Sequence, residues 1–295
     1  MTRDLLVLGG SGVDSTVYVP ELPLPYRDTY HVPPVVDRIG NTGSGVALGC
    51  HALGLRVAFA DLIGDDPQGA LVRHALREVE CRFGRAAAGT TRSVLLVDPA
   101  GRRTSLHDPK ATPGERLPRE LYSDVRARHV HVSITDRCRD VFAGLGGVPV
   151  STDLHDWDGV NAYHEDFAYR ADLVFLSAAA LADPAGVMRA IIARGRAHTV
   201  VCTRGADGCL VLTREAAGEV RAFPAAPLPG PVADTNGAGD AFVSGFLYAL
   251  LRGRPLEERV RLGAIAGAHA CTVAGTHESP IGEPALLARA QAPAG

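Results

Sequence analysis

The chain has 295 residues, of which 46% are hydrophobic, so it can bury a sizeable core and is neither disordered nor fibrous. Its formal net charge of −3 excludes the diffuse positive field that binding to nucleic acid or to an anionic membrane surface requires. The six cysteines form no C-x-x-C pair, and no signal-peptide pattern or membrane-length apolar run is present. We therefore expect a cytoplasmic protein with reduced thiols.

Short apolar runs alternate with longer amphipathic segments along the chain. The runs predict strands at Leu5–Gly9, His129–Ser133, Val148–Thr152, Leu173–Ser177, Thr199–Thr203 and Leu210–Leu212. Helical patterns occupy 67–80, 184–195 and the small-residue segment 263–275. Strands that alternate with helices indicate an α/β fold, with a doubly wound, mostly parallel sheet covered by helices on both faces.

Two segments depart from this alternation. Residues 15–36 are extended and punctuated by prolines, and residues 92–108 have the pattern of a hairpin that turns at 98–101. Neither segment suits the core of a parallel sheet. We expect them to form a small β lid over one edge of a single domain spanning 1–295.

Three glycine clusters could hold a ligand. "GGSGVD" (9–14) follows the first strand, but no helical pattern opens after it, which argues against a dinucleotide fingerprint. "IGNTGSGVALGCHALG" (39–54) runs from a glycine turn into a helix, and close packing alone could explain its small residues. "DTNGAGDAF" (234–242) places two glycines at a helix start, where free N–H groups and the helix dipole attract phosphate oxygens.

Asp240 lies in the first turn of that third helix. A carboxylate there could simply cap the helix. Beside a phosphate site it could instead orient an attacking hydroxyl group and accept its proton during phosphoryl transfer. No G-K-[ST] follows the glycines, so the segment is not a P-loop.

"DTNGAGDAF" matches D-[ST]-x-G-A-G-D-x-F, the second signature of the ribokinase-like (PfkB) carbohydrate kinases. The chain resembles this family in order over nearly its whole length. "GNTGSGVALGCHALGLRVAFADLIGDDPQG" (40–69) resembles the first signature, and "TRGADG" (203–208) resembles the nucleotide loop. The resemblance implies an ATP-dependent kinase that phosphorylates a primary hydroxyl group of a small sugar or sugar-like acceptor.

The resemblance also implies a role for each matching position. Asp240 would be the catalytic base, and the anion hole would comprise Asn236, Gly237, Ala238 and Gly239. ATP would lie along Thr203, Gly205, Gly208 and Thr235, and the acceptor would bind at Asp14, Gly40, Asn41 and Gly43. In family members that have a potassium site, the K⁺ would lie near Asp234 and Thr235.

The chain departs from the family pattern in three places. Gly12 and Gly45 stand where the family often has asparagine, which weakens the expectation of ribose-type recognition. The N-x-x-E motif associated with Mg²⁺ would fall at 177–180, where both functional residues are missing. Asp153 ends a predicted strand, so we expect it to help hold Mg²⁺ or the triphosphate, with Asp234 as a second metal-site candidate.

Several alternatives stay open. The acceptor could be a nucleoside, or the chain could be a catalytically silent relative that binds a ligand or another protein. His129, His131 and His155 could suggest a transition-metal site, but they lack a third ligand at a convincing spacing, and the first two suit a polar strand end. The apolar alternation of Ser93–Val97 leaves a lid face to cover, so we expect a homodimer.

Overall fold

The computed structural model describes residues 1–216 and 218–292. Over these residues the strands form a nine-stranded sheet, in the order β13-β12-β11-β10-β9-β8-β1-β4-β5, and a four-stranded sheet, in the order β3-β2-β6-β7. The strands of the large sheet are β1 (Arg3–Leu8), β4 (Val57–Ile63), β5 (Glu80–Arg85), β8 (Ala127–Ser133), β9 (Val150–Asp153), β10 (Leu173–Ser177), β11 (Thr199–Thr203), β12 (Cys209–Thr213) and β13 (Arg221–Phe223). The helices are α1 (Thr42–Ala52), α2 (Pro67–Ala75), α3 (Glu165–Ala168), α4 (Pro184–Arg194), α5 (Ala238–Leu251), α6 (Leu256–Ala270) and α7 (Glu283–Gln291).

The large sheet is mostly parallel. Every pairing from β11 to β5 is parallel, and β12 and β13 add an antiparallel edge. The carboxyl ends of seven strands therefore meet at one edge of the sheet, which is where ligands bind in folds of this class. The doubly wound α/β prediction is confirmed.

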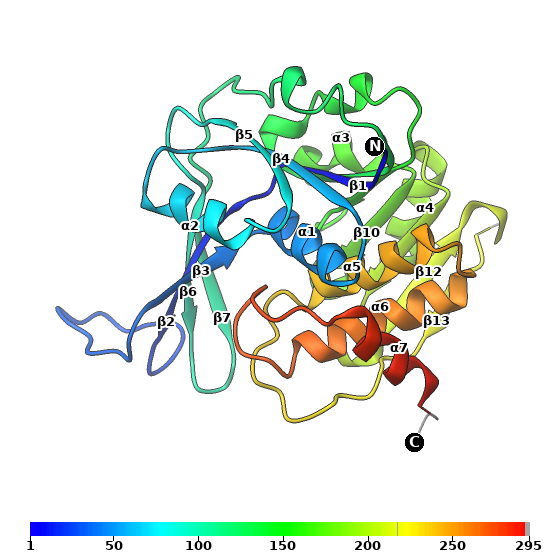
Figure 1. The fold of residues 1–295 in the computed structure, drawn as a ribbon. Helices are drawn as coiled ribbons and strands as arrows, with labels where there is room; N and C mark the ends of the chain where they lie inside the picture. Colours follow the sequence, from blue (N-terminus) through cyan, green and yellow to red (C-terminus); the bar gives the residue numbers. More distant parts are fainter. Residues whose placement is uncertain (217, 293–295) are drawn as a thin grey trace.

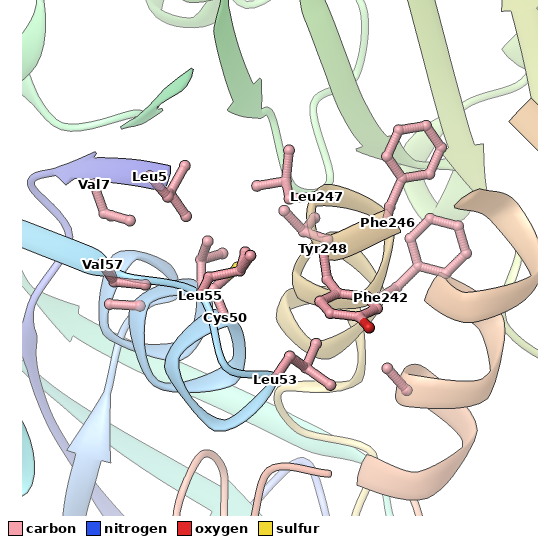
Figure 2. Close-up of a cluster of buried hydrophobic side chains, with 14 of the residues drawn as sticks. Leu5, Val7, Cys50, Leu53, Leu55, Val57, Phe242, Phe246, Leu247 and Tyr248 are labelled. Atoms are coloured by element: carbon pink, nitrogen blue, oxygen red, sulfur yellow. The ribbon is translucent and has the colours of Figure 1, made fainter. Parts of the chain in front are cut away.

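Helices cover both faces of this sheet, as Figure 1 shows. Successive residues of a strand point to opposite faces, so β1 divides its apolar side chains between two cores. Leu5 and Val7 join the core formed with α1, α5 and α6, and part of this core is shown in Figure 2. Leu6 and Leu8 join the opposite core, which contains Trp157.

α5 and α6 pack closely in the first of these cores. A Cβ atom on Gly245 would lie 2.6 Å from the carbonyl oxygen of Leu262, so only a glycine allows this approach. The rings of Phe242, Phe246 and Phe175 cluster beside this contact, with the Phe175 and Phe246 centroids 5.2 Å apart. This packing fixes the amino end of α5 relative to the sheet.

The four-stranded sheet stands apart from the large one in Figure 1. It contains β2 (Gly12–Tyr18), β3 (Val36–Gly40), β6 (Arg92–Val97) and β7 (Arg103–Asp108), and we call it the lid sheet. β6 and β7 form the expected hairpin, whose turn is held by the Asp98 carboxylate through the N–H groups of Ala100 and Arg102. The other expected lid segment supplies most of β2 and the start of β3.

Several expected element boundaries were wrong. The helix expected over 67–80 ends at Ala75, and Glu80 already belongs to β5. The helix expected over 263–275 spans Leu256–Ala270. His129 and His131 do not form a polar strand end: both are buried inside the sheet and share the Ser151 hydroxyl group at 2.9 Å. Within the described residues, no helix is long and apolar enough to cross a membrane.

Candidate active site

The amino end of α5 meets the carboxyl edge of the large sheet. Asp153 ends β9, and its register partners are Ser133 on β8 and Phe175 on β10. Asp240 lies in the first turn of α5, close enough to Asp153 for charge repulsion to add to burial in raising the pKa of its carboxyl group. The carboxylate expected to hold the metal and the carboxylate expected to act as base therefore lie in one site.

The loop before α5 exposes backbone N–H groups. Gly237 is the N-cap with φ +76°, and no side chain caps the helix. The Asp234 carboxylate is turned into the loop, where it accepts a hydrogen bond from the Asn236 N–H at 2.8 Å. The uncapped N–H groups and the helix dipole make this turn suited to bind an anion such as a phosphate group.

Asp240 is buried, with 8% of its surface exposed. Burial is the main reason why the pKa of its carboxyl group is raised well above the usual value, and repulsion from Asp153 and Asp14 adds to it. The positive charge of the Arg103 guanidinium lowers this pKa. A raised pKa makes the carboxylate a stronger base than an exposed aspartate.

Asp14 lies on β2 of the lid sheet. Burial raises the pKa of its carboxyl group to about 6, against the lowering effects of Ser93, Arg103 and Asn236. Gly40 packs directly on this carboxyl group, since a Cβ atom there would lie 2.3 Å from Asp14 Cγ. Gly40 therefore has a packing role that its place in the motif did not reveal.

The other acceptor-site candidates form the start of α1. Asn41 is its N-cap with φ 65°, and its Nδ2 atom is buried without a hydrogen-bond partner among the described residues. A Cβ atom on Gly43 would lie 1.9 Å from the Gly9 carbonyl oxygen, so this glycine lets α1 approach the turn after β1. An unpaired buried amide is costly, and a ligand hydroxyl group could satisfy it.

Arg103 is a site residue that the sequence did not identify. It begins β7, and its guanidinium contacts Asn236 Oδ1 in the loop before α5. Arg103 therefore joins the lid sheet to the candidate anion hole and places a positive charge near Asp14 and Asp240. In the sequence it is indistinguishable from the preceding Arg102, which instead pairs with Asp98.

The chain is similar to known proteins over nearly its whole length. The sequence model described as pfkB family carbohydrate kinase matches residues 167–282. An acarbose 7(IV)-phosphotransferase from Actinoplanes sp. is 52% identical over 291 residues, which cover 96% of this chain and 97% of that protein. This chain belongs to the pfkB family of carbohydrate kinases.

Solved structures support the same assignment. A microbiome-derived acarbose kinase is 45% identical and superimposes with a TM-score of 0.90, covering 99% of this chain and 100% of that chain. The Arabidopsis thaliana ribokinase complexed with ribose and ATP is 19% identical with a TM-score of 0.81, and the match covers 99% of both chains. At 19% identity, the similarity to the ribokinase shows the fold alone. As a carbohydrate kinase, the protein uses ATP.

The candidate nucleotide loop of this pfkB kinase joins β11 to β12. Thr203 ends β11 beside Ser177 of β10, at the same edge of the sheet as Asp153. Gly208 has φ +79°, and a Cβ atom there would lie 2.0 Å from the Phe223 carbonyl oxygen. Gly205 also has a positive φ, and its Cα faces open space. Thr203, Gly205 and Gly208 lie at the sheet edge, whereas Thr235 is exposed in the loop before α5.

The kinase lacks a carboxylate at the end of β10. The Ser177 hydroxyl group accepts a hydrogen bond from the Ala179 N–H at 3.2 Å, and so caps the short turn that contains Ala180. Among the described residues, no three His, Cys, Asp or Glu side chains form a metal-binding group. Mg²⁺ in kinases is often held by one or two carboxylates together with substrate phosphates, and Asp153 fits that pattern.

Proposed function

We propose that this kinase transfers the γ-phosphoryl group of ATP to a primary hydroxyl group of acarbose or a closely related sugar-like molecule, with Asp240 as the catalytic base. The observation that carries the proposal is the position of the buried Asp240 carboxylate in the first turn of an uncapped helix. The choice of acceptor rests on the 52% identity to the acarbose 7(IV)-phosphotransferase.

Asp240 prepares the acceptor for attack. Its carboxylate accepts the hydroxyl proton while the hydroxyl oxygen forms a bond to the γ-phosphorus, and the bond from that phosphorus to the bridging oxygen breaks to release ADP. Only the ionised carboxylate can accept the proton, so activity should rise with pH as Asp240 loses its own proton. Its raised pKa places this acid limb above the range of an exposed aspartate.

The loop of Asn236, Gly237, Ala238 and Gly239 would stabilise the charge that develops on the transferred group. Its N–H groups are fixed before the reaction begins, so little reorganisation is needed when that charge forms. Arg103 approaches this loop from the lid and would add a positive charge at the same place. Mg²⁺, held by Asp153 and phosphate oxygens, would neutralise part of the triphosphate charge.

The remaining residues would bind the two substrates. Asp14 and Asn41 offer acceptor hydroxyl groups a carboxylate and a free amide, in a space limited by Gly40. Thr203, Gly205, Gly208 and Thr235 would lie along ATP. A monovalent cation beside Asp234, and a cytoplasmic location, stay predictions.

ADP release from the purified protein tests the proposal. The assay contains ATP, Mg²⁺ and a panel of acarbose, ribose, fructose, adenosine and cytidine, and mass spectrometry identifies the phosphorylated product. We expect acarbose to be the best acceptor and Asp240→Asn to lower kcat by about 10²–10⁴-fold. Asp124→Asn, at an exposed aspartate just before β8 and so at the amino edge of the sheet, opposite to the site, is the matched control and should leave kcat unchanged.

The panel also separates the alternatives. A preference for adenosine or cytidine would establish a nucleoside kinase. Absence of ADP release above background with every acceptor would favour a catalytically silent relative. Full activity of Asp240→Asn would refute the assignment of the base.

A further inference from the structure

Three residues of the lid sheet form a row beside the candidate base. Asp14 on β2 is the register partner of Ser93 on β6, and Ser93 is the register partner of His107 on β7. Register partners on neighbouring strands point to the same face of a sheet. Asp14 is near enough to Asp240 for repulsion to raise the pKa of Asp240. The face that carries the row therefore covers the candidate active site.

Hydrogen bonds join the members of this row. Ser93 Oγ lies 3.0 Å from His107 Nδ1. A hydrogen bond from Ser93 also lowers the pKa of Asp14, against the larger effect of burial. A serine hydroxyl group carries a single hydrogen, and an ionised carboxylate can only accept hydrogen bonds. Ser93 therefore donates to Asp14 and accepts from His107, which places the ring hydrogen of His107 on Nδ1.

The second ring nitrogen of His107 can only accept a hydrogen bond. Burial lowers the pKa of His107 below its usual value, although the Asp108 carboxylate favours the charged form. The ring is therefore uncharged at neutral pH and carries one hydrogen, on Nδ1. Nε2 is left with a lone pair and no hydrogen. His107 is an exposed residue, so a hydroxyl group of a bound substrate can reach this atom and donate to it.

His107 faces the carboxyl edge of the large sheet. A positive charge on His155 lowers the pKa of His107, so the two rings lie within electrostatic range of each other. His155 follows β9, and its N–H group donates to the Asp153 carboxylate at 2.9 Å. The exposed ring of His107 therefore lies near the loop after β9, at the edge of the sheet where substrates bind in folds of this class.

We propose that His107 is a specificity-determining residue, whose Nε2 atom accepts a hydrogen bond from a substrate hydroxyl group other than the one that is phosphorylated. Ser93 is a positioning residue, because its one hydroxyl group fixes both the imidazole ring and the Asp14 carboxylate. This inference rests on the proposed function, since it adds a contact to the same sugar-like substrate that Asp14 binds.

The experiment measures kcat and KM for acarbose in wild type, His107→Phe, His107→Gln and His107→Asn. Phenylalanine keeps a ring without nitrogens, glutamine can place its carbonyl oxygen near the position of Nε2, and asparagine reaches only the position of Nδ1. For His107→Phe we expect the KM for acarbose to rise about 3–10-fold with kcat nearly unchanged, because a neutral hydrogen bond is lost from the ground state and the transition state alike. His107→Gln should recover most of the lost affinity, whereas His107→Asn should not. The KM for ATP should stay at its wild-type value in all three variants.

A double-variant cycle tests the role of Ser93. Ser93→Ala should raise the KM for acarbose more than His107→Phe does, because it releases both the Asp14 carboxylate and the His107 ring. Once the ring is no longer fixed, adding His107→Phe should raise KM by a smaller factor than it does in wild type. Independent, multiplicative effects on KM would overturn the positioning role of Ser93.

His198→Phe is the matched control, because His198 is an exposed histidine just before β11, at the amino edge of the large sheet. It should leave kcat and KM unchanged. A wild-type KM for acarbose in His107→Phe would overturn the proposal. Recovery in His107→Asn but not in His107→Gln would also overturn it, since the bond to Ser93 would then be all that His107 contributes.

A measurement on the unaltered chain detects the contact itself. In ¹⁵N-histidine NMR, the Nε2 signal that is lost in His107→Gln should show a nitrogen without hydrogen, and it should shift when acarbose is added without ATP. A signal that shows a hydrogen on Nε2, or that does not shift at saturating acarbose, would overturn the proposal. If the wild-type protein did not phosphorylate acarbose, the proposed function would fail first. Failure of this inference would leave that activity intact, so the two failures are distinguishable.

Discussion

Gly237→Ala tests whether the backbone before α5 must hold its position for phosphoryl transfer. Gly237 has φ +76°, and a Cβ atom there would lie 2.3 Å from the carbonyl oxygen of Thr276. That atom is backbone and cannot rotate away. A normal contact requires about 1 Å more, so the loop itself must shift by a distance of that order. Displacements of about 1 Å at reacting groups can lower rates by about 10²-fold, and we expect that loss in kcat.

Gly253→Ala is the matched control at the other end of α5. Gly253 has φ +71°, but a Cβ atom there would meet nothing within 4 Å. Both substitutions should cost about 1–2 kcal/mol for the left-handed backbone, and only Gly237→Ala adds the clash. Tm should therefore fall by several degrees in both variants and further in Gly237→Ala.

The assay is steady-state ADP release with saturating ATP and acceptor, together with thermal melting of each variant. Gly253→Ala should keep wild-type kcat at temperatures well below its Tm. The reasoning is refuted if Gly237→Ala keeps kcat within about threefold of wild type, because the required shift would then not disturb the transition state.

Three further predictions concern the charges and the lid. Asp14→Asn removes a negative neighbour of Asp240, so the pKa of Asp240 should fall and the acid limb of kcat should move to lower pH. Arg103→Ala removes a positive neighbour and should move the acid limb to higher pH. Shifts in the same direction in both variants would contradict this reasoning. Asp153→Ala should raise the Mg²⁺ concentration for half-maximal activity, and an unmoved midpoint in a magnesium titration would leave Asp153 without a metal role. The exposed outer strand β7 of the lid sheet favours a homodimer, which light scattering would exclude if it gave a monomer mass at high protein concentration.

The sequence predicted the centre of the large sheet better than its edge. β10 and β11 are continuous apolar runs because helices cover them on both faces. β5 is an edge strand with the sequence ECRFGR, whose charged residues are only partly buried. The alternation of polar and apolar residues in β5 is too weak to distinguish it from the preceding helical pattern. The helix predicted over 67–80 therefore extends into Glu80, the first residue of β5. No separate strand is predicted for β4, because it lies within the segment 40–69 that resembles the first signature.

The candidate site likewise contains some residues that could be predicted from the sequence and others that could not. A local pattern can place Gly237 and Asp240 on one helix turn, because they are neighbours in the chain. Arg103 reaches that turn across a separation of 133 residues, and no feature of its own segment separates it from Arg102. His277 meets Asp240 only because α1, α5 and the segment after α6 pack together, with glycines at the two contacts. Tertiary packing brings such residues into the site, and it produces no periodic pattern in the sequence from which they could be predicted.

The charge balance of the site depends on these long-range contacts. Burial of Asp240, together with repulsion from Asp153 on β9 and from Asp14 on the lid sheet, favours the protonated form of the base. A base in that form cannot accept the acceptor's proton. Arg103 from the lid opposes this effect, and a Mg²⁺ ion beside Asp153 would oppose it further. Asp240 should therefore become a competent base only when the lid and the metal-bound nucleotide are both in place. Such coupling would link proton abstraction to the presence of both substrates and limit wasteful hydrolysis of ATP.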